Sequence, residues 1–256
     1  MDFTLKIYRR MLETLKASGY RFIAFEDYCR EGFPEGSAKA IILRHDVDLR
    51  AENSLATAKI EHSLDIRATY FFRVVPQSDK PSIIKEIASL GHEIGYHYED
   101  MAICGGDTEK AIAHFDEKLN YFRQYYPVKT ICMHGAPTSR FDGKDLWKKY
   151  SYRDYGIIGE PYFDVNFSYV FYLTDTGRCW DGSRFSVRDK VRTSFVQTYH
   201  STNQIIEAAM QGSLPPRIMI TTHPQRWTDN KTQWIKELLL QNAKNVVKRI
   251  LLLIRK

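Results

Sequence analysis

The sequence has few cysteines and no long run of apolar residues. The four cysteines, Cys29, Cys104, Cys132 and Cys179, lie far apart and form no C-x-x-C pair. This spacing argues against a disulfide framework and against a zinc site built of thiolates. No stretch reaches the roughly 18–20 apolar residues of a membrane-spanning helix, and the charged N-terminal segment lacks the apolar run of a signal peptide. We therefore expect a reduced, cytoplasmic location.

The sequence also lacks a strong excess of charge of one sign. It has 37 Lys and Arg against 31 Asp and Glu, which gives a net charge of +6 spread along the chain. This excess is too small to predict a nucleic-acid partner. Hydrophobic residues make up 43% and charged residues 27% of the 256 positions, which excludes a disordered chain. Because there is no linker-like or repetitive tract, we expect residues 1–256 to form one domain.

Several motifs of common enzyme classes are absent. There is no G-x-G-x-x-G after the first predicted strand and no G-x-x-x-x-G-K-[ST], so the phosphate cradles of nucleotide-binding folds are unsupported. There is no G-x-S-x-G, which argues against a serine hydrolase of the α/β type.

Short apolar runs alternate with segments of helical periodicity along most of the chain. The apolar runs predict strands at residues 40–43, 68–75, 93–96, 130–133 and 217–221. The helical periods predict helices at residues 49–62, 81–90, 107–125, 202–210 and 234–254, the first of them with Asp48 as its N-cap. Residues 141–194 are less regular. Strands separated by helices predict an α/β fold with a mostly parallel sheet, closed or nearly closed into a (β/α) barrel.

Histidine and aspartate follow four of the predicted strands directly. Asp46 and Asp48 follow the first strand, His97 follows the run HEIGY, His134 follows TICM, and His223 follows RIMIT. In a barrel of parallel strands the carboxyl ends share one rim, where active sites are built. A single such residue is usually a loop residue or a helix cap. Four segments that place these residue types at the same rim together indicate a site.

The residue types at this rim suit metal-assisted hydrolysis. Asp46 and Asp48 can divide the work, one binding a metal ion and the other accepting a proton. Imidazoles from other strands would complete the metal site, and neutral imidazole with carboxylate suits zinc or a similar divalent ion. One further imidazole could protonate a leaving group.

The other histidines are expected to be structural. His92 lies at an odd offset from His97 and therefore on the opposite face of its strand, where it would satisfy backbone groups. His62, His114 and His200 lie on or beside predicted helices.

Five segments resemble the polysaccharide deacetylase family, also called carbohydrate esterase family 4. They are RHDVD (44–48), ATYFF (68–72), GHEIGYH (91–97), MHGAPTS (133–139) and ITTHPQRW (220–227), in the family's order. The resemblance implies a distorted barrel of about seven parallel strands and removal of an acyl group, N-acetyl first, from a sugar or glycan precursor. It also implies that Asp46 is the general base, that Asp48 and His97 bind a divalent metal (zinc, or else cobalt, nickel or manganese), and that His223 is the general acid.

Two departures from the family pattern concern the metal. Met101 stands where the second histidine of the family's His-x-x-x-His motif would fall, and His134 stands where the family usually has an arginine. A thioether is a poor ligand for zinc among oxygen and nitrogen donors. His134 can therefore supply the third ligand. Two alternatives stay open, namely a metal-independent amidohydrolase of the same fold that acts on a small cyclic amide, and an inactive barrel that binds a glycan or a partner.

Three further features allow two interpretations each. Asp175 follows the apolar run VFYLT and would either orient His223 or form a turn. The aromatic residues Trp180, Trp227, Tyr162, Phe163, Tyr169 and Tyr172 would form either a sugar platform or core. Residues 241–256 contain five basic residues and no acidic ones. They could contact an anionic membrane surface, but we favour a closing helix of the barrel with its apolar side buried.

Overall fold

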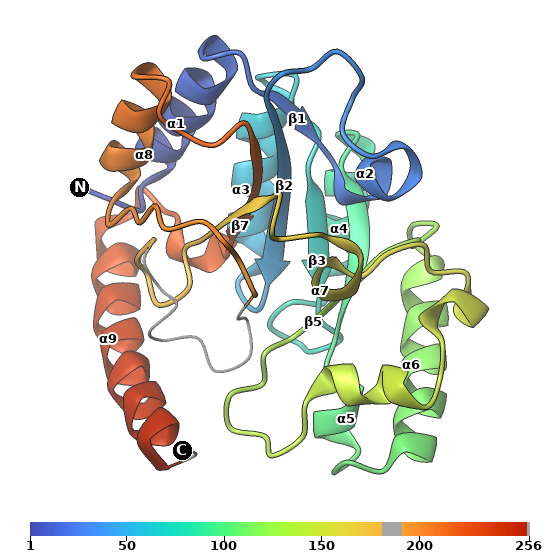
Figure 1. Cartoon of the computed structure of the whole chain (residues 1–256). Coiled ribbons are helices and arrows are strands. Elements are labelled where there is room, and N and C mark those ends of the chain that lie inside the picture. The colour runs from blue at the N-terminus through green and yellow to red at the C-terminus, as the bar shows by residue number, and fades with distance from the viewer. Residues whose placement is uncertain (181–190, 255–256) are drawn as a thin grey trace.

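The computed structural model describes residues 1–180 and 191–254 (Figure 1). The strands are β1 (Arg21–Ile23), β2 (Ala40–Val47), β3 (Thr69–Phe72), β4 (Glu93–Tyr98), β5 (Ile131–Met133), β6 (Phe171–Thr174) and β7 (Arg217–Thr222). The α-helices are α1 (Leu5–Ala17), α2 (Phe25–Glu31), α3 (Ala51–His62), α4 (Pro81–Ser89), α5 (Asp100–Ile103), α6 (Thr108–Arg123), α7 (Pro161–Asp164), α8 (Thr202–Met210) and α9 (Lys231–Ile254). Short 3₁₀ helices are η1 (Gly143–Lys148), η2 (Tyr152–Tyr155) and η4 (Pro224–Arg226).

The seven strands form one parallel sheet around β2. The order is β5-β4-β3-β2-β7-β6, and β1 also pairs with β2. β1 pairs with residues 40–42 of β2, and β3 pairs with residues 44–47 of β2. β1 and β3 therefore lie one after the other along the same edge of β2. The sheet curls, and among the described residues β5 and β6 do not pair. The predicted distorted barrel of parallel strands is thus confirmed, as a half-barrel that is open between β5 and β6.

The predicted elements occur with shifted ends, and the structure adds elements that were not predicted, namely α1, α2, α5, α7, β1 and β6. β1 has three residues and β6 has four, and strands this short do not show the alternation of apolar and polar residues that identifies a strand in a sequence. β6 lies within residues 141–194, the less regular part of the sequence. Asp48 is not the N-cap of α3: Arg50 holds that position in a left-handed conformation, without a side-chain capping bond.

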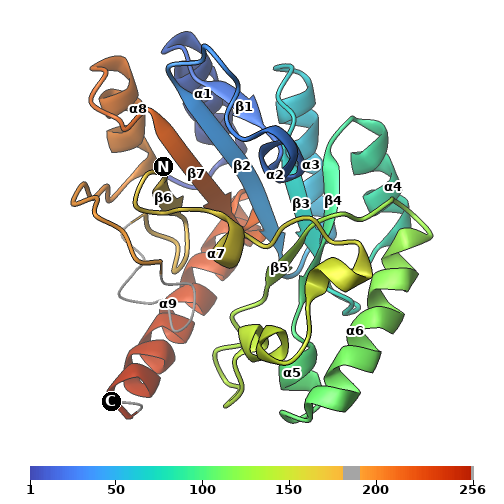
Figure 2. The same cartoon turned by 45° about the vertical axis from the view of Figure 1, so that its right-hand side comes forward.

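The helices lie mainly on the outer face of the curved sheet. Figures 1 and 2 show α1, α3, α4, α6 and α8 around this face, while α7 lies across the inner side. The larger apolar core fills the layer between the sheet and the outer helices. A second, smaller core lies inside the half-barrel and includes Ile42, Phe71 and Met219.

The strand period decides which side chains point into the half-barrel. On β2, Ile41 and Leu43 belong to the outer core, and Ile42 belongs to the inner core. Because side chains alternate along a strand, Arg44 and Asp46 lie on the same inner face as Ile42. All eight residues of β2 are buried, so this central strand carries charged groups into the interior.

Gly95 on β4 shows how tightly the interior is filled. A Cβ atom at this position would lie 2.4 Å from two ring carbons of Phe71. The glycine therefore makes room for the aromatic ring below the rim.

The C-terminal helix α9 differs from the expectation that its apolar side is buried. Among the side chains of α9 whose burial is described, the buried ones are polar, namely Glu237, Gln241 and Asn245. Six apolar side chains of α9 are at least half exposed: Ile235, Leu239, Leu240, Val246, Val247 and Ile250. The prediction that α9 buries its apolar side is therefore wrong. Within residues 1–180 and 191–254, no helix is long and apolar enough to cross a membrane.

Candidate active site

The five side chains expected at the rim come together in the structure. Asp46 and Asp48 from the end of β2, His97 from β4, His134 after β5 and His223 after β7 line one small cavity of about 50 Å³. Each occupies an inner-face position, because the half-barrel interior receives every second residue of its strand. The convergence that the strand-end pattern predicted is thus observed.

Asp48 stands between two imidazoles at a spacing that suits a metal ion. Its Oδ1 lies 3.6 Å from His97 Nε2 and 3.6 Å from His134 Nε2. Two ligand atoms on a tetrahedral zinc with bonds of about 2.0–2.1 Å are about 3.3 Å apart. Oδ1 is buried and accepts no hydrogen bond from the described residues. A buried oxygen without a partner, facing two imidazole nitrogens, fits a divalent cation between them.

Hydrogen bonds fix the orientation of both imidazoles. His97 Nδ1 donates to the backbone oxygen of Cys132 at 2.9 Å, and His134 Nδ1 donates to Glu99 Oε2 at 2.8 Å. The backbone oxygen can only accept, so Nδ1 of His97 carries a proton, and Nε2, which faces Asp48, is the nitrogen left to bind a metal ion. Partners of this kind orient the imidazole ligands of metal sites.

Met101 lies away from these ligands. Its side chain on α5 is 4% exposed and packs in the outer core. His134, rather than Met101, therefore faces Asp48, which is the arrangement that a replacement of the missing histidine requires.

A second group of possible ligands lies deeper in the half-barrel. Ligand atoms of Asp46, His97 and Cys132 lie within 4.8 Å of one another. However, the buried guanidinium of Arg44 donates to Cys132 Sγ at 2.8 Å and to Asp46 Oδ2 at 3.3 Å. A cation bound there would be repelled by this guanidinium at close range in a buried region. The Asp48 group is therefore the better metal site.

Arg44 also holds Asp46 in place. While Oδ2 of Asp46 accepts from the guanidinium, Oδ1 is buried with no hydrogen-bond partner among the described residues. The guanidinium is itself fixed by Thr221, whose hydroxyl accepts from Nε at 2.7 Å. One carboxylate oxygen thus stays available at the cavity.

His223 is oriented by a buried carboxylate. Its Nδ1 lies 2.6 Å from Asp175 Oδ1, and its backbone N–H donates to Asp175 Oδ2 at 3.0 Å. Trp227 Nε1 donates to the same carboxylate at 2.8 Å. Burial raises the pKa of Asp175, but the charges of Arg226 and His223 outweigh this and lower it. The anionic carboxylate therefore points His223 Nε2 towards Asp48 Oδ2, 4.0 Å away.

The charges of the rim keep its carboxyl groups ionised. Burial would raise the pKa of Asp48, but His97, His134 and His223 hold it well below its usual range. Burial would likewise raise the pKa of Glu99, yet His134 and Arg73 lower it to about 2. Both carboxylates therefore stay charged near neutral pH.

Three residues of the site were missed by the sequence reasoning: Arg44, Glu99 and Gln225. Gln225 Nε2 donates to Asp48 Oδ2 at 3.2 Å. Arg44 lies two residues before Asp46 and Glu99 two after His97. The strand period of two could have singled out these two, because it places them on the inner face.

The histidine predicted to be structural at position 92 has that role. His92 Nδ1 accepts from the backbone N–H of Ala68 at 3.2 Å, and Nε2 lies 3.1 Å from the backbone oxygen of Ala58. His45, on the outer face of β2, is bound within the core by Thr222 and Glu61 and does not line the cavity.

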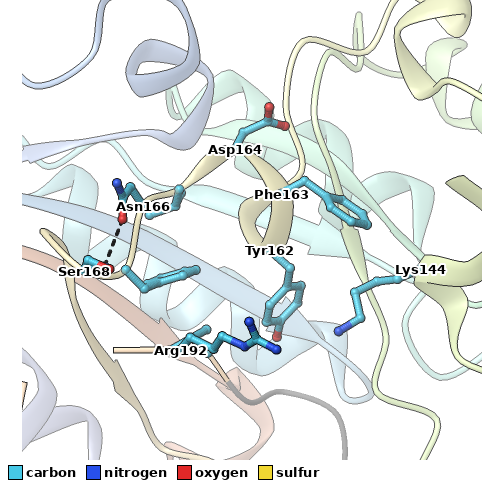
Figure 3. A pocket seen from close by; sticks show the side chains of 10 residues that line it. Lys144, Tyr162, Phe163, Asp164, Asn166, Ser168 and Arg192 are labelled. Carbon is cyan, nitrogen blue, oxygen red and sulfur yellow. Dashed lines mark hydrogen bonds between the residues drawn. The ribbon is translucent and has the colours of Figure 1, made fainter. Parts of the chain in front are cut away.

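The aromatic residues divide between core and surface. Trp180 and Trp227 are buried in the outer core, so they form no sugar platform. Tyr162 and Phe163 line a separate open pocket of about 520 Å³. Figure 3 shows Lys144 and Arg192 beside Tyr162 in this pocket. The Tyr162 hydroxyl accepts from Arg44 at 3.4 Å, which joins the pocket wall to the guanidinium that holds Asp46.

Comparison with known proteins finds solved structures that are similar to this chain. No family model and no curated protein sequence matches the chain. The CE4 family pseudoenzyme BA3943 from Bacillus anthracis is 12% identical with a TM-score of 0.46, covering 80% of this chain. This chain spans 61% of that structure's length.

Two further solved structures are similar to this chain, one named for the CE4 family and one named for its activity. The Xyl-CE4 domain of a multidomain xylanase, from the hindgut metagenome of Trinervitermes trinervoides, is 12% identical with a TM-score of 0.40 over 82% of this chain and 84% of its own. The Bc1960 peptidoglycan N-acetylglucosamine deacetylase is 17% identical with a TM-score of 0.41 over 82% and 85%. Two of these three structures carry the name of the family that the motifs resemble.

Proposed function

We propose that the protein is a metal-dependent hydrolase that removes an acyl group, N-acetyl first, from a sugar or glycan precursor. The observation that carries this proposal is the geometry around Asp48. Its Oδ1, which accepts no hydrogen bond within residues 1–180 and 191–254, lies 3.6 Å from the Nε2 atoms of both His97 and His134. A carboxylate that could accept a proton and an imidazole that could donate one line the same cavity.

Asp48, His97 and His134 would hold the metal ion. A set of one carboxylate and two imidazoles suits zinc, and cobalt, nickel or manganese are the alternatives. When bound, such an ion polarises the acyl carbonyl and stabilises the negative charge that develops on its oxygen. Gln225 donates to the other oxygen of Asp48, which favours the orientation in which Oδ1 faces the two imidazoles.

Asp46 would act as the general base. Its Oδ1 borders the cavity and has no hydrogen-bond partner in the part of the chain that the structure describes, so it can accept a proton from an attacking water molecule. Arg44 binds Oδ2, which leaves Oδ1 as the oxygen that would accept that proton.

His223 would act as the general acid. Amide hydrolysis expels an amine, which leaves only after protonation. Asp175 accepts the Nδ1 proton of His223, so Nε2 is the nitrogen that can donate a proton into the cavity.

The test is acetate release from N-acetylated sugars, measured together with the metal content of the protein. We expect the activity to disappear after chelation and to return with zinc or cobalt. In Asp46→Asn, turnover should fall by about 10²–10⁴-fold while bound metal is retained, because the amide cannot accept the proton. The exposed Asp229→Asn serves as the matched control and should keep full activity.

Other outcomes separate the alternatives. Turnover that survives complete metal removal would favour a metal-independent amidohydrolase. Glycan binding without turnover in the metal-loaded protein would favour an inactive binding barrel. Loss of metal in Asp46→Asn would place Asp46 among the ligands and contradict the division of work between the two aspartates.

A further inference from the structure

The outward face of α9 is apolar over much of the helix. Ile235, Leu239, Val246 and Ile250 are 50–65% exposed. Their spacing of four, seven and four residues places them on one stripe of an α-helix. Leu240 and Val247 are 52% exposed each and widen this stripe, which we call the outer stripe.

The opposite face of α9 is fixed to the protein by polar contacts. Glu237 Oε2 lies 3.3 Å from Arg50 Nη1, and Asn245 Nδ2 donates to the backbone oxygen of Gly177 at 2.9 Å. Gln241 lies between them and donates to Asn245 at 2.7 Å. Because these contacts set the rotation of the helix, the outer stripe cannot turn inwards without breaking them. Figures 1 and 2 show α9 at the edge of the molecule, extending beyond the strands.

The charges of α9 are of one sign on the exposed side. Lys231, Lys236 and Lys244 are exposed, and the only acidic residue of residues 231–254 is Glu237, which is buried against Arg50. A contiguous apolar stripe on a soluble surface marks an interaction site. Apolar side chains flanked by lysines, without exposed acids, are typical of a helix that lies in the interface of an anionic membrane.

We propose that α9 docks the protein peripherally on an anionic membrane surface through the outer stripe. A second copy of this chain fits less well, because a symmetric contact between two α9 helices would bring Lys236 and Lys244 of both copies together without an exposed carboxylate on either helix. Lys248 of α9 lines the same cavity as Asp48 and His223, so docking would hold the rim of the half-barrel close to the lipid headgroups.

The test is co-sedimentation of the full-length protein with vesicles. We expect binding to vesicles of phosphatidylcholine mixed with phosphatidylglycerol, little binding to phosphatidylcholine alone, and weaker binding at high salt. The triple variant Leu239→Gln/Val246→Gln/Ile250→Gln should lower the partition coefficient by at least about tenfold, because three half-exposed apolar side chains lose their burial in lipid.

Controls keep the result interpretable. Ile103→Gln replaces an apolar side chain of similar exposure, 53%, on α5, which lies away from α9 in both views. It should bind as the unaltered protein does. Lys236→Glu/Lys244→Glu should weaken binding to anionic vesicles only. Circular dichroism and thermal unfolding check that each variant is folded.

Two outcomes overturn the proposal. Equal binding of the triple variant and the unaltered protein would show that the outer stripe does not contact lipid. Absence of vesicle binding, with a dimer in light scattering that the triple variant abolishes, would make the stripe a contact between copies. Neither outcome depends on catalysis, so failure of the deacetylase proposal leaves this test intact.

Discussion

At the scale of single residues, the site depends on which nitrogen of each imidazole carries a proton. His97 and His134 both use Nδ1 for a hydrogen bond that points away from the cavity. Their Nε2 atoms therefore face Asp48 and are the nitrogens left to bind a metal ion. The site has two imidazoles beside Asp48 because the residue directly after β5, His134, supplies the second.

We predict that His134 is the third metal ligand. His134→Ala should lower zinc affinity by at least about 10–100-fold, an effect expected even for the loss of an orienting partner. Met101→Ala should leave zinc affinity nearly unchanged, although it removes a buried side chain and costs about 2–5 kcal/mol of stability. Titration of the metal-free proteins with zinc measures both affinities. The opposite ranking of the two variants, or unchanged affinity in His134→Ala, would rule out this ligand.

The sequence predicted the residues that line the site better than the residues that hold them in place. Asp46, Asp48, His97 and His223 could be found because each is a reactive residue type directly after an apolar run. Their partners could not be found in that way. Arg44 lies inside a buried strand, where a charge is normally excluded, and only the structure shows the partners that make its burial tolerable.

At the scale of elements, the two faces of β2 serve different purposes. The outer face packs against helices, whereas the inner face carries Arg44 and Asp46 towards the rim. Periodicity predicted this strand and its position. It could not predict β1, which has only three residues, or the rotation of α9, because polar contacts with Arg50 and Gly177 decide it.

Gly95 on β4 gives a test of the packing inside the half-barrel. Gly95→Ala should destabilise the protein by about 1–3 kcal/mol, because the new Cβ would overlap the ring of Phe71. The double variant Gly95→Ala/Phe71→Leu should show a favourable coupling, since the smaller side chain makes room for the methyl group. Urea unfolding of both single variants and the double variant measures the coupling. If the changes in the free energy of unfolding of the two single variants simply add in the double variant, the ring of Phe71 does not limit the size of the side chain at position 95.

At the scale of the whole molecule, a buried carboxyl couples stability to pH. Glu93 lies within the half-barrel and accepts hydrogen bonds from Thr69 and Thr130 and from the backbone of Glu26. Burial nevertheless raises its pKa to about 7. Between about pH 4.5, where an unfolded glutamate titrates, and pH 7, the unfolded chain loses this proton while the folded protein keeps it.

We therefore predict that Glu93 makes the protein less stable as the pH rises through this window. The loss should be on the order of 3 kcal/mol at most and complete above about pH 7. Glu93→Gln cannot ionise, so its free energy of unfolding, measured in urea between pH 5 and 8, should fall less than that of the unaltered protein. Glu13→Gln, at an exposed position, is the control and should follow the unaltered protein. Parallel profiles for Glu93→Gln and the unaltered protein would contradict the prediction.

The pairing of β2 with β7 has a consequence for synthesis of the chain. Arg44 and Thr221, which meet across these two strands, are 177 residues apart. A chain emerging from the ribosome can form the contacts of β2 with β1 and β3 early, but the other edge of β2 stays unpaired until β7 has been made. An exposed edge of a buried strand invites association with other chains, so nascent chains should need protection for most of translation. His223 follows β7 directly, so the cavity that it lines is completed only after β7 has been made.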